Sequence, residues 1–325
     1  MPAISASAPG KVILFGEHAV VYERPAIAVP VSQVSVRVVV LPIPTGRPGQ
    51  ILVDAPDIGL HSELSQLPSD HPLVLLAATV QSELKLSHLP ALSLWIKSTI
   101  PVAAGLGSGA AVSVAITRAL SEFLGHPLPD ERVCEVAFRI ERKYHSTPSG
   151  IDNTVITYGQ PIYYVKGRPF DRLSVRKPFI MVIADSGIKS ETAAVVGDIR
   201  NHWQADPGRY ETLFDAIAGI THQARDIIED GSTKDLGPLM NENQHLLHAL
   251  GVSCPELDRL VKTALDNGAL GAKLAGAGRG GNMIALVEQT TANAIAQSLK
   301  SAGAVRTIIT EVQTSSKVLA GNRPC

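Results

Sequence analysis

The sequence of 325 residues is poor in cysteine, in aromatic side chains and in net charge. Its three cysteines have neither paired nor metal-ligand spacing, and their odd number argues against a disulfide framework, so a reducing compartment is the simpler setting. The 29 basic residues nearly balance the 30 acidic ones, which leaves a formal net charge of −1. This balance gives no electrostatic basis for binding nucleic acid or an anionic membrane surface.

Long hydrophobic runs are also missing. The run Leu73–Ala78 is far too short to cross a bilayer, which takes about 20 apolar residues. The first residues, MPAISASAPGK, lack the basic start and the apolar stretch of a signal peptide. We therefore expect a cytoplasmic protein without a membrane segment. Its 45% hydrophobic residues indicate an ordered globular chain.

The order of patterns along the chain predicts two domains. Strand-like runs dominate the first quarter, helical patterns follow, and a new buried strand begins at Phe179, just after the charged, proline-containing stretch Arg176–Pro178. We therefore predict an N-terminal domain over residues 1–177 and a C-terminal domain over residues 178–325, both of the α/β class.

The elements expected from these patterns fall into two sets. Strands are predicted at Val12–Phe15, Val34–Leu41, Ile51–Val53, Leu92–Lys97, Ile162–Val165, Phe179–Ala184, Met283–Val287 and Thr307–Val312. Helices are predicted at Leu73–Leu84, Ala110–Leu124, Glu131–His145, Tyr210–Glu229, Leu236–Leu250, Leu257–Asn267 and Ala292–Ala302.

The most informative segment is the glycine-rich loop Pro101–Ala111 (PVAAGLGSGAA), which joins a predicted strand to a predicted helix. Unpaired N–H groups in the first turn of a helix bind anions, and glycines let a phosphate approach the backbone closely. A tight turn that packs a helix on a sheet explains such a loop equally well. The chain has no G-x-x-x-x-G-K-[ST] sequence, and the other glycine cluster, Gly276–Gly281, leads into a strand rather than the helix that a dinucleotide site needs.

Three further segments carry side chains suited to phosphoryl transfer, which needs a phosphate cradle, a cation and a positioned hydroxyl. Lys11 precedes an apolar strand that ends at Gly16-Glu17-His18. Glu141 and Asp152 flank a Pro-Ser-Gly turn, where two carboxylates could serve Mg²⁺ and a substrate hydroxyl. The third segment is the glycine-rich stretch Lys273–Asn282. Each also has a plain structural explanation: an edge lysine, a helix-terminal glutamate, a capping aspartate and a turn.

Taken together, these segments resemble the GHMP small-molecule kinase family, and within it the branch that phosphorylates mevalonate. The resemblance covers nearly the whole chain in order, through APGKVILFGEHAVVY, PVAAGLGSGAA, ERKYHSTPSGIDN, MNENQHLLHALGVS and KLAGAGRGG. It implies a two-domain GHMP kinase fold, in which an N-terminal domain like that of ribosomal protein S5 (domain 2) precedes a ferredoxin-like C-terminal domain. ATP would bind between the domains with Mg²⁺, mevalonate would be the acceptor, and a homodimer is a common assembly.

The resemblance also implies roles for individual residues. Asp152 and Lys11 are the expected catalytic pair, with Asp152 accepting or orienting the proton of the C5 hydroxyl. Glu141 and Ser108 are the expected Mg²⁺ ligands. The residues expected around the nucleotide are Pro101, Ala104, Gly105, Leu106, Gly107, Ser108, Gly109 and Ala110. Those expected at mevalonate are Lys11, Glu17, His18, Asp152, Gly276 and Ala277.

Two of the motifs depart from the common family pattern. Gly109 stands where a second serine is usual, so the hydroxyl expected on Mg²⁺ is missing, and Ser108 or a water would replace it. Ala275 and Arg279 replace a threonine and a glycine of the third motif. Arg279 could face a phosphate, but we favour a surface position and leave it out of the site.

Three other functions stay open at this stage. Another GHMP kinase, such as a phosphomevalonate kinase or galactokinase, would keep the ATP loop and change the acceptor pocket. A diphosphomevalonate decarboxylase has a related fold but lacks the A-P-G-K segment found here at Ala8–Lys11. A non-catalytic sensor of metabolites would have no chemical need for Lys11, Glu141 and Asp152 together.

Overall fold

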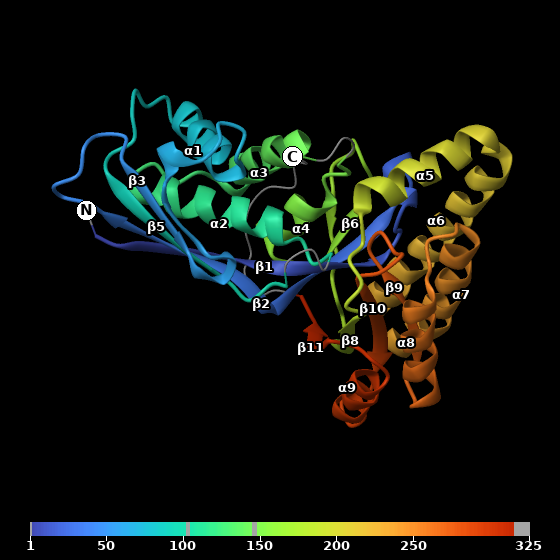
Figure 1. The fold of residues 1–325 in the computed structure, drawn as a ribbon. Coiled ribbons are helices and arrows are strands. Elements are labelled where there is room, and N and C mark those ends of the chain that lie inside the picture. Colours follow the sequence, from blue (N-terminus) through green and yellow to red (C-terminus); the bar gives the residue numbers. More distant parts are fainter. Residues whose placement is uncertain (1, 102–104, 145–147, 315–325) are drawn as a thin grey trace.

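The computed structural model describes residues 2–101, 105–144 and 148–314. Within these residues the strands form two sheets, one of seven strands built from the first part of the chain and one of four strands built from the last part. Figure 1 shows the first sheet and its helices in blue to green, and the second sheet with its helices in yellow-green to red. The change from one sheet to the other falls after residue 172, and the exact domain boundary at 177 and 178 stays a prediction.

The first sheet has the order β4-β3-β5-β2-β6-β7, with β1 paired to β2 beside this path. Its longest strands are antiparallel partners whose valines and isoleucines suit a pleated, buried surface, and in β2 Val34, Val36, Val38 and Val40 all face the core. The strands are β1 (Ile4–Phe15), β2 (Ala26–Pro42), β3 (Ile51–Ala55), β4 (Leu60–Glu63), β5 (Leu92–Ser98), β6 (Ile162–Tyr164) and β7 (Asp171–Arg172).

Four helices cover one face of this sheet in Figure 1: α1 (Pro72–Glu83), α2 (Ser108–Phe123), α3 (Asp130–Tyr144) and α4 (Ile151–Tyr158). The central helix is α2, which packs against β1, β2 and the other three helices. Its polar positions Ser113, Thr117 and Ser121 are buried as well. The hydroxyls of Thr117 and Ser121 donate to backbone carbonyls of α2 itself, so the helix can be enclosed on all sides.

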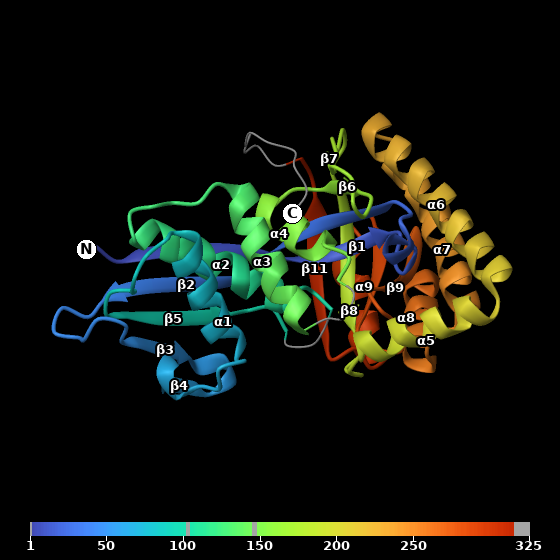
Figure 2. The same ribbon diagram turned by 90° about the horizontal axis from the view of Figure 1, so that it is seen from above.

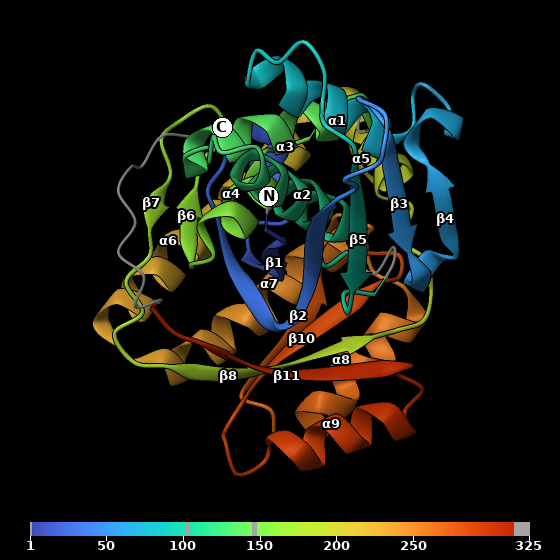
Figure 3. The same cartoon turned by 90° about the vertical axis from the view of Figure 1, so that its left-hand side faces the viewer.

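The second sheet has the order β11-β8-β10-β9 with every neighbouring pair antiparallel, which is the strand order of a ferredoxin-like domain. Figure 3 shows β8, β10 and β11 crossing below the first sheet, with α9 on their far side. The strands are β8 (Phe179–Asp185), β9 (Gly271–Ala275), β10 (Asn282–Val287) and β11 (Arg306–Val312), and the helices are α5 (Thr192–Ala205), α6 (Pro207–Asp230), α7 (Leu236–Ala249), α8 (Pro255–Asp266) and α9 (Ala292–Ser301).

Strand β8 carries apolar residues on both faces, and both faces are buried. Phe179, Met181 and Ile183 join the core that the first sheet shares, whereas Val182 and Ala184 join the core beneath the helices of the second domain. A continuous apolar run is typical of a strand buried on both faces. The two domains therefore share part of one hydrophobic core and are not joined by the chain alone.

Helix α7 and strand β9 approach each other through two glycines. A Cβ added to Gly271 would lie 2.2 Å from the carbonyl oxygen of Gly237, and a Cβ on Gly237 would lie 2.2 Å from the carbonyl oxygen of Leu270. We expect Gly271→Ala to lower the free energy of unfolding by about 2–3 kcal/mol, because two backbones would have to separate. Gly219→Ala, within α6 with no atom closer than 4 Å, is the matched control and should stabilise by about 0.5–1 kcal/mol. Urea unfolding of both variants tests this, and equal stabilities would contradict it.

Candidate active site

Lys11 lies on β1 where that strand is irregular. The pairing of β1 with β2 shifts register between Pro9 and Gly10, so the backbone next to Lys11 is displaced from the regular ladder. The N–H group of Lys11 donates instead to the carbonyl of Leu106, at 3.0 Å, in the glycine-rich loop. This bond ties the loop directly to the strand that carries the lysine. The side chain of Lys11 is buried, with 4% of the residue exposed, which is rare for a lysine without a partner.

Asp152 provides that partner. Its Oδ1 lies 2.9 Å from Nζ of Lys11. The aspartate stands in the first turn of α4, and the residue that caps this helix is Gly150, so the capping role that the sequence allowed for Asp152 is not found. Gly150 has a φ of 88°, and a Cβ there would lie 2.7 Å from Oη of Tyr164, so only glycine fits. The turn before α4 therefore fixes the start of the helix and with it the position of Asp152.

Glu141 stands in the last turn of α3, close enough to interact with both members of the pair. The pKa of Glu141 is raised to about 8, chiefly by burial and then by the charge of Asp152, against an opposing effect of the charge of Lys11. The pKa of Tyr164 is raised to about 12, by burial and then by Glu141. The structure thus brings together the three charged residues that the sequence singled out. Once Glu141 loses its proton, two carboxylates face one lysine, and a second cation could bind beside them.

The glycine-rich loop lies against this cluster. Gly105, Leu106 and Gly107 precede α2, while Ser108, Gly109 and Ala110 form its first turn, so the predicted helix start at Ala110 is two residues late. Gly107 has a φ of 74°, and a Cβ there would lie 2.8 Å from Cδ1 of Ile156 and 3.0 Å from Cγ of Lys11. The free N–H groups of the helix start therefore stand beside the lysine, as an anion site requires. Pro101 lies at the near end of the loop, and Ala104 is outside the described residues.

His18 and Ala277 meet from opposite domains. Nε2 of His18 lies 3.0 Å from the carbonyl oxygen of Ala277, in the loop between β9 and β10. The pKa of His18 is lowered to about 4, chiefly by burial, while the hydrogen bond to Ala277 raises it and the charges of Arg279 and Lys273 lower it further. The ring is therefore neutral at pH 7, and because its partner is a carbonyl, Nε2 carries the proton and donates it. The φ of His18 is 62°, a value that residues other than glycine rarely adopt.

Glu17 is almost completely enclosed. The residue is 1% exposed, one carboxylate oxygen pairs with Nζ of Lys273 on β9, and the other accepts from Nδ2 of Asn243 at 3.4 Å. Lys273 is a residue that the sequence did not single out beyond its place in the third motif. That Glu17 touches the acceptor stays a prediction, and these contacts favour an indirect role.

The glycines of the third motif allow close packing of the β9–β10 loop. Gly276 has a φ of 89° and open space around the position of a Cβ, whereas a Cβ on Gly278 would lie 2.0 Å from the carbonyl oxygen of Val252. Arg279 pairs with Asp198 of α5 and donates to the carbonyl of Gly251 at 3.2 Å, so it anchors the loop to the second domain. Ser190 donates to the carbonyl of Gly278 and does not cap α5, whose capping residue is Glu191.

Two family models match this chain. The model of the GHMP kinases N-terminal domain matches residues 73–160, and the model of the GHMP kinases C-terminal region matches residues 224–305. Together they cover more than half of the sequence. The chain belongs to the GHMP kinase family.

Comparison with individual relatives shows which GHMP kinases this chain resembles in sequence. The mevalonate kinase of Pyrococcus horikoshii is 36% identical, over 93% of this chain and 93% of its own. The crystal structure of L. major mevalonate kinase in complex with R-mevalonate superposes with a TM-score of 0.83 at 34% identity, over 96% of this chain and 97% of that one. The Streptococcus pneumoniae phosphomevalonate kinase has a TM-score of 0.79 but only 15% identity, over 95% of this chain and 100% of that one, and shares the fold alone. This GHMP kinase therefore groups with the mevalonate kinases, and the predicted fold is confirmed.

Magnesium is the metal that a kinase of this family implies. Among residues 2–101, 105–144 and 148–314, no group of three or more His, Cys, Asp or Glu side chains is arranged to hold a metal ion. Mg²⁺ usually takes one or two carboxylates and fills its other positions with substrate phosphates and waters. Glu141 fits this mode because it lies beside Asp152, and loss of its proton leaves two carboxylates against a single lysine. The residues therefore suit Mg²⁺ that arrives with a nucleotide.

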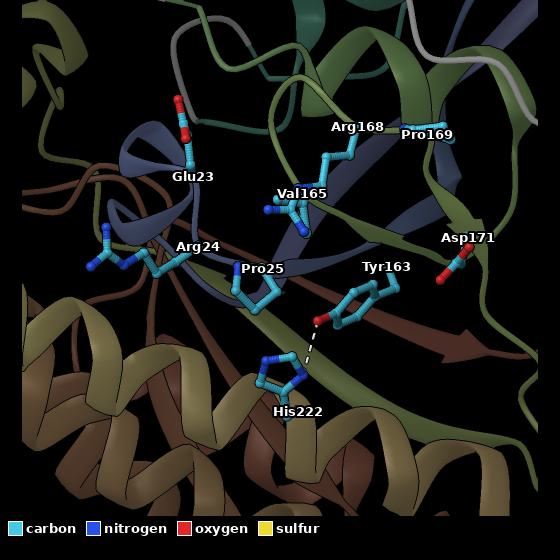
Figure 4. Close-up of a pocket in the computed structure, with 9 residues that line it drawn as sticks. All are labelled: Glu23, Arg24, Pro25, Tyr163, Val165, Arg168, Pro169, Asp171 and His222. Carbon is cyan, nitrogen blue, oxygen red and sulfur yellow. Dashed lines mark hydrogen bonds between the residues drawn. The ribbon is translucent and has the colours of Figure 1, made fainter.

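A separate cavity of about 420 Å³ lies between the β6–β7 hairpin and α6 of this GHMP kinase (Figure 4). Oη of Tyr163 and Nδ1 of His222 lie 3.0 Å apart across it. Two of its charged residues are paired, Arg24 with acids of α6 and Asp171 with Arg225. None of the predicted site residues lines the cavity, so we do not assign phosphoryl transfer to it.

No helix among the described residues is both long and apolar enough to cross a membrane.

Proposed function

We propose that this GHMP kinase transfers the γ-phosphoryl group of ATP to the C5 hydroxyl of mevalonate, giving 5-phosphomevalonate and ADP for isoprenoid synthesis. The observation that carries the proposal is the ion pair between Lys11 and Asp152, at 2.9 Å, beside the glycine-rich start of α2. Phosphoryl transfer depends mainly on positioning and charge stabilisation. A cation, a proton acceptor and a phosphate cradle within one cluster meet those needs.

Asp152 accepts the proton of the attacking hydroxyl or holds that hydroxyl in line with the phosphorus. Lys11 neutralises charge that develops on the attacking oxygen and on the transferred group. Because the transition state of phosphoryl transfer is loose, it demands little activation of the nucleophile, so orientation by Asp152 contributes even where proton transfer is late. The buried stem of Lys11, packed against Gly107, keeps the ammonium group in one place.

The nucleotide phosphates bind the backbone N–H groups at the start of α2. This cradle consists of Pro101, Ala104, Gly105, Leu106, Gly107, Ser108, Gly109 and Ala110. Glu141 and Ser108 hold Mg²⁺, which neutralises the phosphate charge when it is bound. In support, Ser108 is the first residue of α2 and makes no side-chain hydrogen bond within the described residues, so its hydroxyl is available.

The acceptor lies on the side of the cluster where the two domains meet. His18, Gly276 and Ala277 line this side, and Lys11 and Asp152 face the hydroxyl that reacts. Mevalonate is the acceptor that the relatives favour, because the proteins of Pyrococcus horikoshii and L. major, at 36% and 34% identity, are mevalonate kinases. A homodimer and a cytoplasmic location stay predictions.

Gly109→Ser restores the hydroxyl of the common family pattern. No atom lies within 4 Å of the position of its Cβ, and the residue is helical, so the variant should fold at least as well as the parent. We expect apparent Mg²⁺ affinity in the presence of ATP to rise a few-fold, by roughly the value of one added oxygen ligand. Titration of the rate with Mg²⁺ measures this. An unchanged affinity would mean that Ser108 or a water already fills the position.

The proposed function is tested by ADP release from the purified protein with Mg²⁺-ATP and one acceptor at a time. Mevalonate is compared with phosphomevalonate, diphosphomevalonate, galactose and homoserine, and phosphorus NMR identifies the product. Mevalonate-dependent ADP and a 5-phosphate ester are the expected result. Release of carbon dioxide from diphosphomevalonate, turnover of another acceptor, or nucleotide binding without turnover would each contradict the proposal.

A further inference from the structure

The ion pair between Lys273 and Glu17 is completely enclosed at the contact between the two domains. The side chain of Lys273 is 0% exposed and that of Glu17 is 1% exposed. Lys273 lies on β9 of the second sheet, and Glu17 directly follows Gly16 at the end of β1, which lies beside β9 (Figure 2). Besides Glu17, Nζ of Lys273 donates to the carbonyl of Leu274 at 2.8 Å.

Stability alone does not account for such a pair. Removing two charges from water costs more than their attraction commonly returns, and apolar residues of similar size often serve as well or better. The best-documented role of a buried ion pair is to fix how two segments are aligned. The position of Lys273 and Glu17 therefore points to a constraint on the two segments that they join.

Each of the two segments contains a residue other than glycine with a positive φ, a conformation that is unfavourable for such residues. His18, next to Glu17, has a φ of 62°, and Arg279, in the loop after β9, has a φ of 52°. Such residues persist where their surroundings fix them, and they cluster at ligand sites. His18 also donates to the carbonyl of Ala277, four residues beyond Lys273. The two links hold the Gly16–His18 turn at two points, one on strand β9 and one in the β9–β10 loop.

We propose that Lys273 is a positioning residue for the acceptor side of the site: through Glu17 it holds the turn that carries His18 in register with Ala277 and Gly276. The inference rests on the proposed function, because His18, Gly276 and Ala277 are the residues that we assign to the acceptor. Glu17 then acts through this link and not by touching the acceptor. Neither residue takes part in the proton or phosphoryl transfer.

The decisive variant removes both charges together. Lys273→Met alone leaves Glu17 buried without its cation and should lower the melting temperature. The double variant Glu17→Gln/Lys273→Met leaves no buried charge, so its melting temperature should return close to that of the parent. The KM of the double variant for the acceptor should still be raised by roughly 10- to 100-fold, because a shift of about 1 Å in the residues that hold a substrate has an effect of this size. The nucleotide Kd should stay unchanged.

Arg24→Met is the matched control. Arg24 belongs to the same segment as Glu17 and also joins it to the second domain, through Glu211 and Asp215 of α6, but its side chain is 25% exposed. This variant should leave the acceptor KM unchanged. An equal rise of KM in Arg24→Met would show that any loosening of the contact between the domains has the same effect, and it would overturn the proposal.

The other outcomes are also informative. A double variant with the parent acceptor KM would show that the pair only stabilises the fold. If that variant does not fold, Glu17→Leu/Lys273→Met, which fills the space with apolar atoms, is measured in its place, and failure of both charge-free pairs to fold would likewise contradict a positioning role. The unsubstituted protein is assayed first with mevalonate. Should it phosphorylate a different acceptor, the proposed function is wrong, and the comparison of variants is made with that acceptor.

Discussion

Asp152→Asn lowers kcat by about 10³-fold and leaves the nucleotide Kd close to that of the parent protein. The expected loss lies within the roughly 10²- to 10⁴-fold range that a positioned acid or base contributes. Asparagine keeps the size of the side chain, so it preserves packing at the start of α4, but it neither accepts a proton nor pairs with the ammonium group of Lys11. Single-turnover phosphoryl transfer at saturating ATP and mevalonate measures the effect on the chemical step.

Lys11→Met tests the other member of the same pair. Methionine follows the path of the lysine stem in its buried position, so the variant should fold, while loss of the ammonium group should lower kcat by at least as much. Because Lys11 lowers the pKa of Glu141, its removal should also raise that pKa further. Circular dichroism and nucleotide binding accompany the kinetics of both variants. A folded, nucleotide-binding variant with a kcat near that of the parent would refute the assigned roles.

The residues of this cluster were singled out from the sequence because each lies in a local motif, and their roles followed from the resemblance that the motifs carry in order along the chain. The glycine-rich loop before α2 and the apolar strand after Lys11 were visible as patterns, and both were found. Helix α4, which carries Asp152, was not predicted. It has only eight residues and directly follows Pro148-Ser149-Gly150, a turn that gave no helical period to detect.

Other elements were missed for similar reasons. Strand β9 (GAKLA) is short, and its glycine and alanines have low strand propensity, so no pattern marked it, although β10 beside it was predicted. Strand β1 begins at Ile4, eight residues before the predicted start, because the small residues of ISASAPG do not alternate clearly. Helix α5 was also not predicted, and Ser190, which precedes it, donates to the carbonyl of Gly278 in the β9–β10 loop.

The pairing of Glu17 with Lys273 could not be predicted from the sequence. The two residues are 256 positions apart, and a glutamate and a lysine at that distance have no spacing that relates them. Their contact follows from the shared core of the two domains, which brings the end of β1 to β9. The contact of His18 with Ala277 has the same origin. The parts of the site that depend on how the domains meet therefore needed the structure.

Glu141→Gln separates stability from activity. The pKa of Glu141 is raised from 4.5 to about 8 in the folded protein, by burial, then by Asp152. The folded state thus keeps a proton that the unfolded chain loses above about pH 4.5. The contribution of this group to stability is full below that pH and is lost as pH rises through 8. Glutamine stays neutral, so above pH 8 the metal-free variant should be more stable than the parent by about 3 kcal/mol, less than the full linkage value because Glu141 is partly exposed.

The same residue should make Mg²⁺ binding dependent on pH. A ligand carboxylate must lose its proton before it binds a metal, so with a pKa of about 8 the binding of Mg²⁺ and nucleotide at pH 7 releases close to one proton. The apparent affinity should rise roughly 25-fold between pH 6.5 and pH 8.5. Calorimetry in two buffers of different ionisation enthalpy measures the released proton, and Glu141→Gln should abolish both the release and the pH dependence along with most of kcat. Proton release that persists in the variant would assign the titrating group elsewhere, whereas loss of kcat without any change in proton release would leave Glu141 catalytic but remove it from the metal.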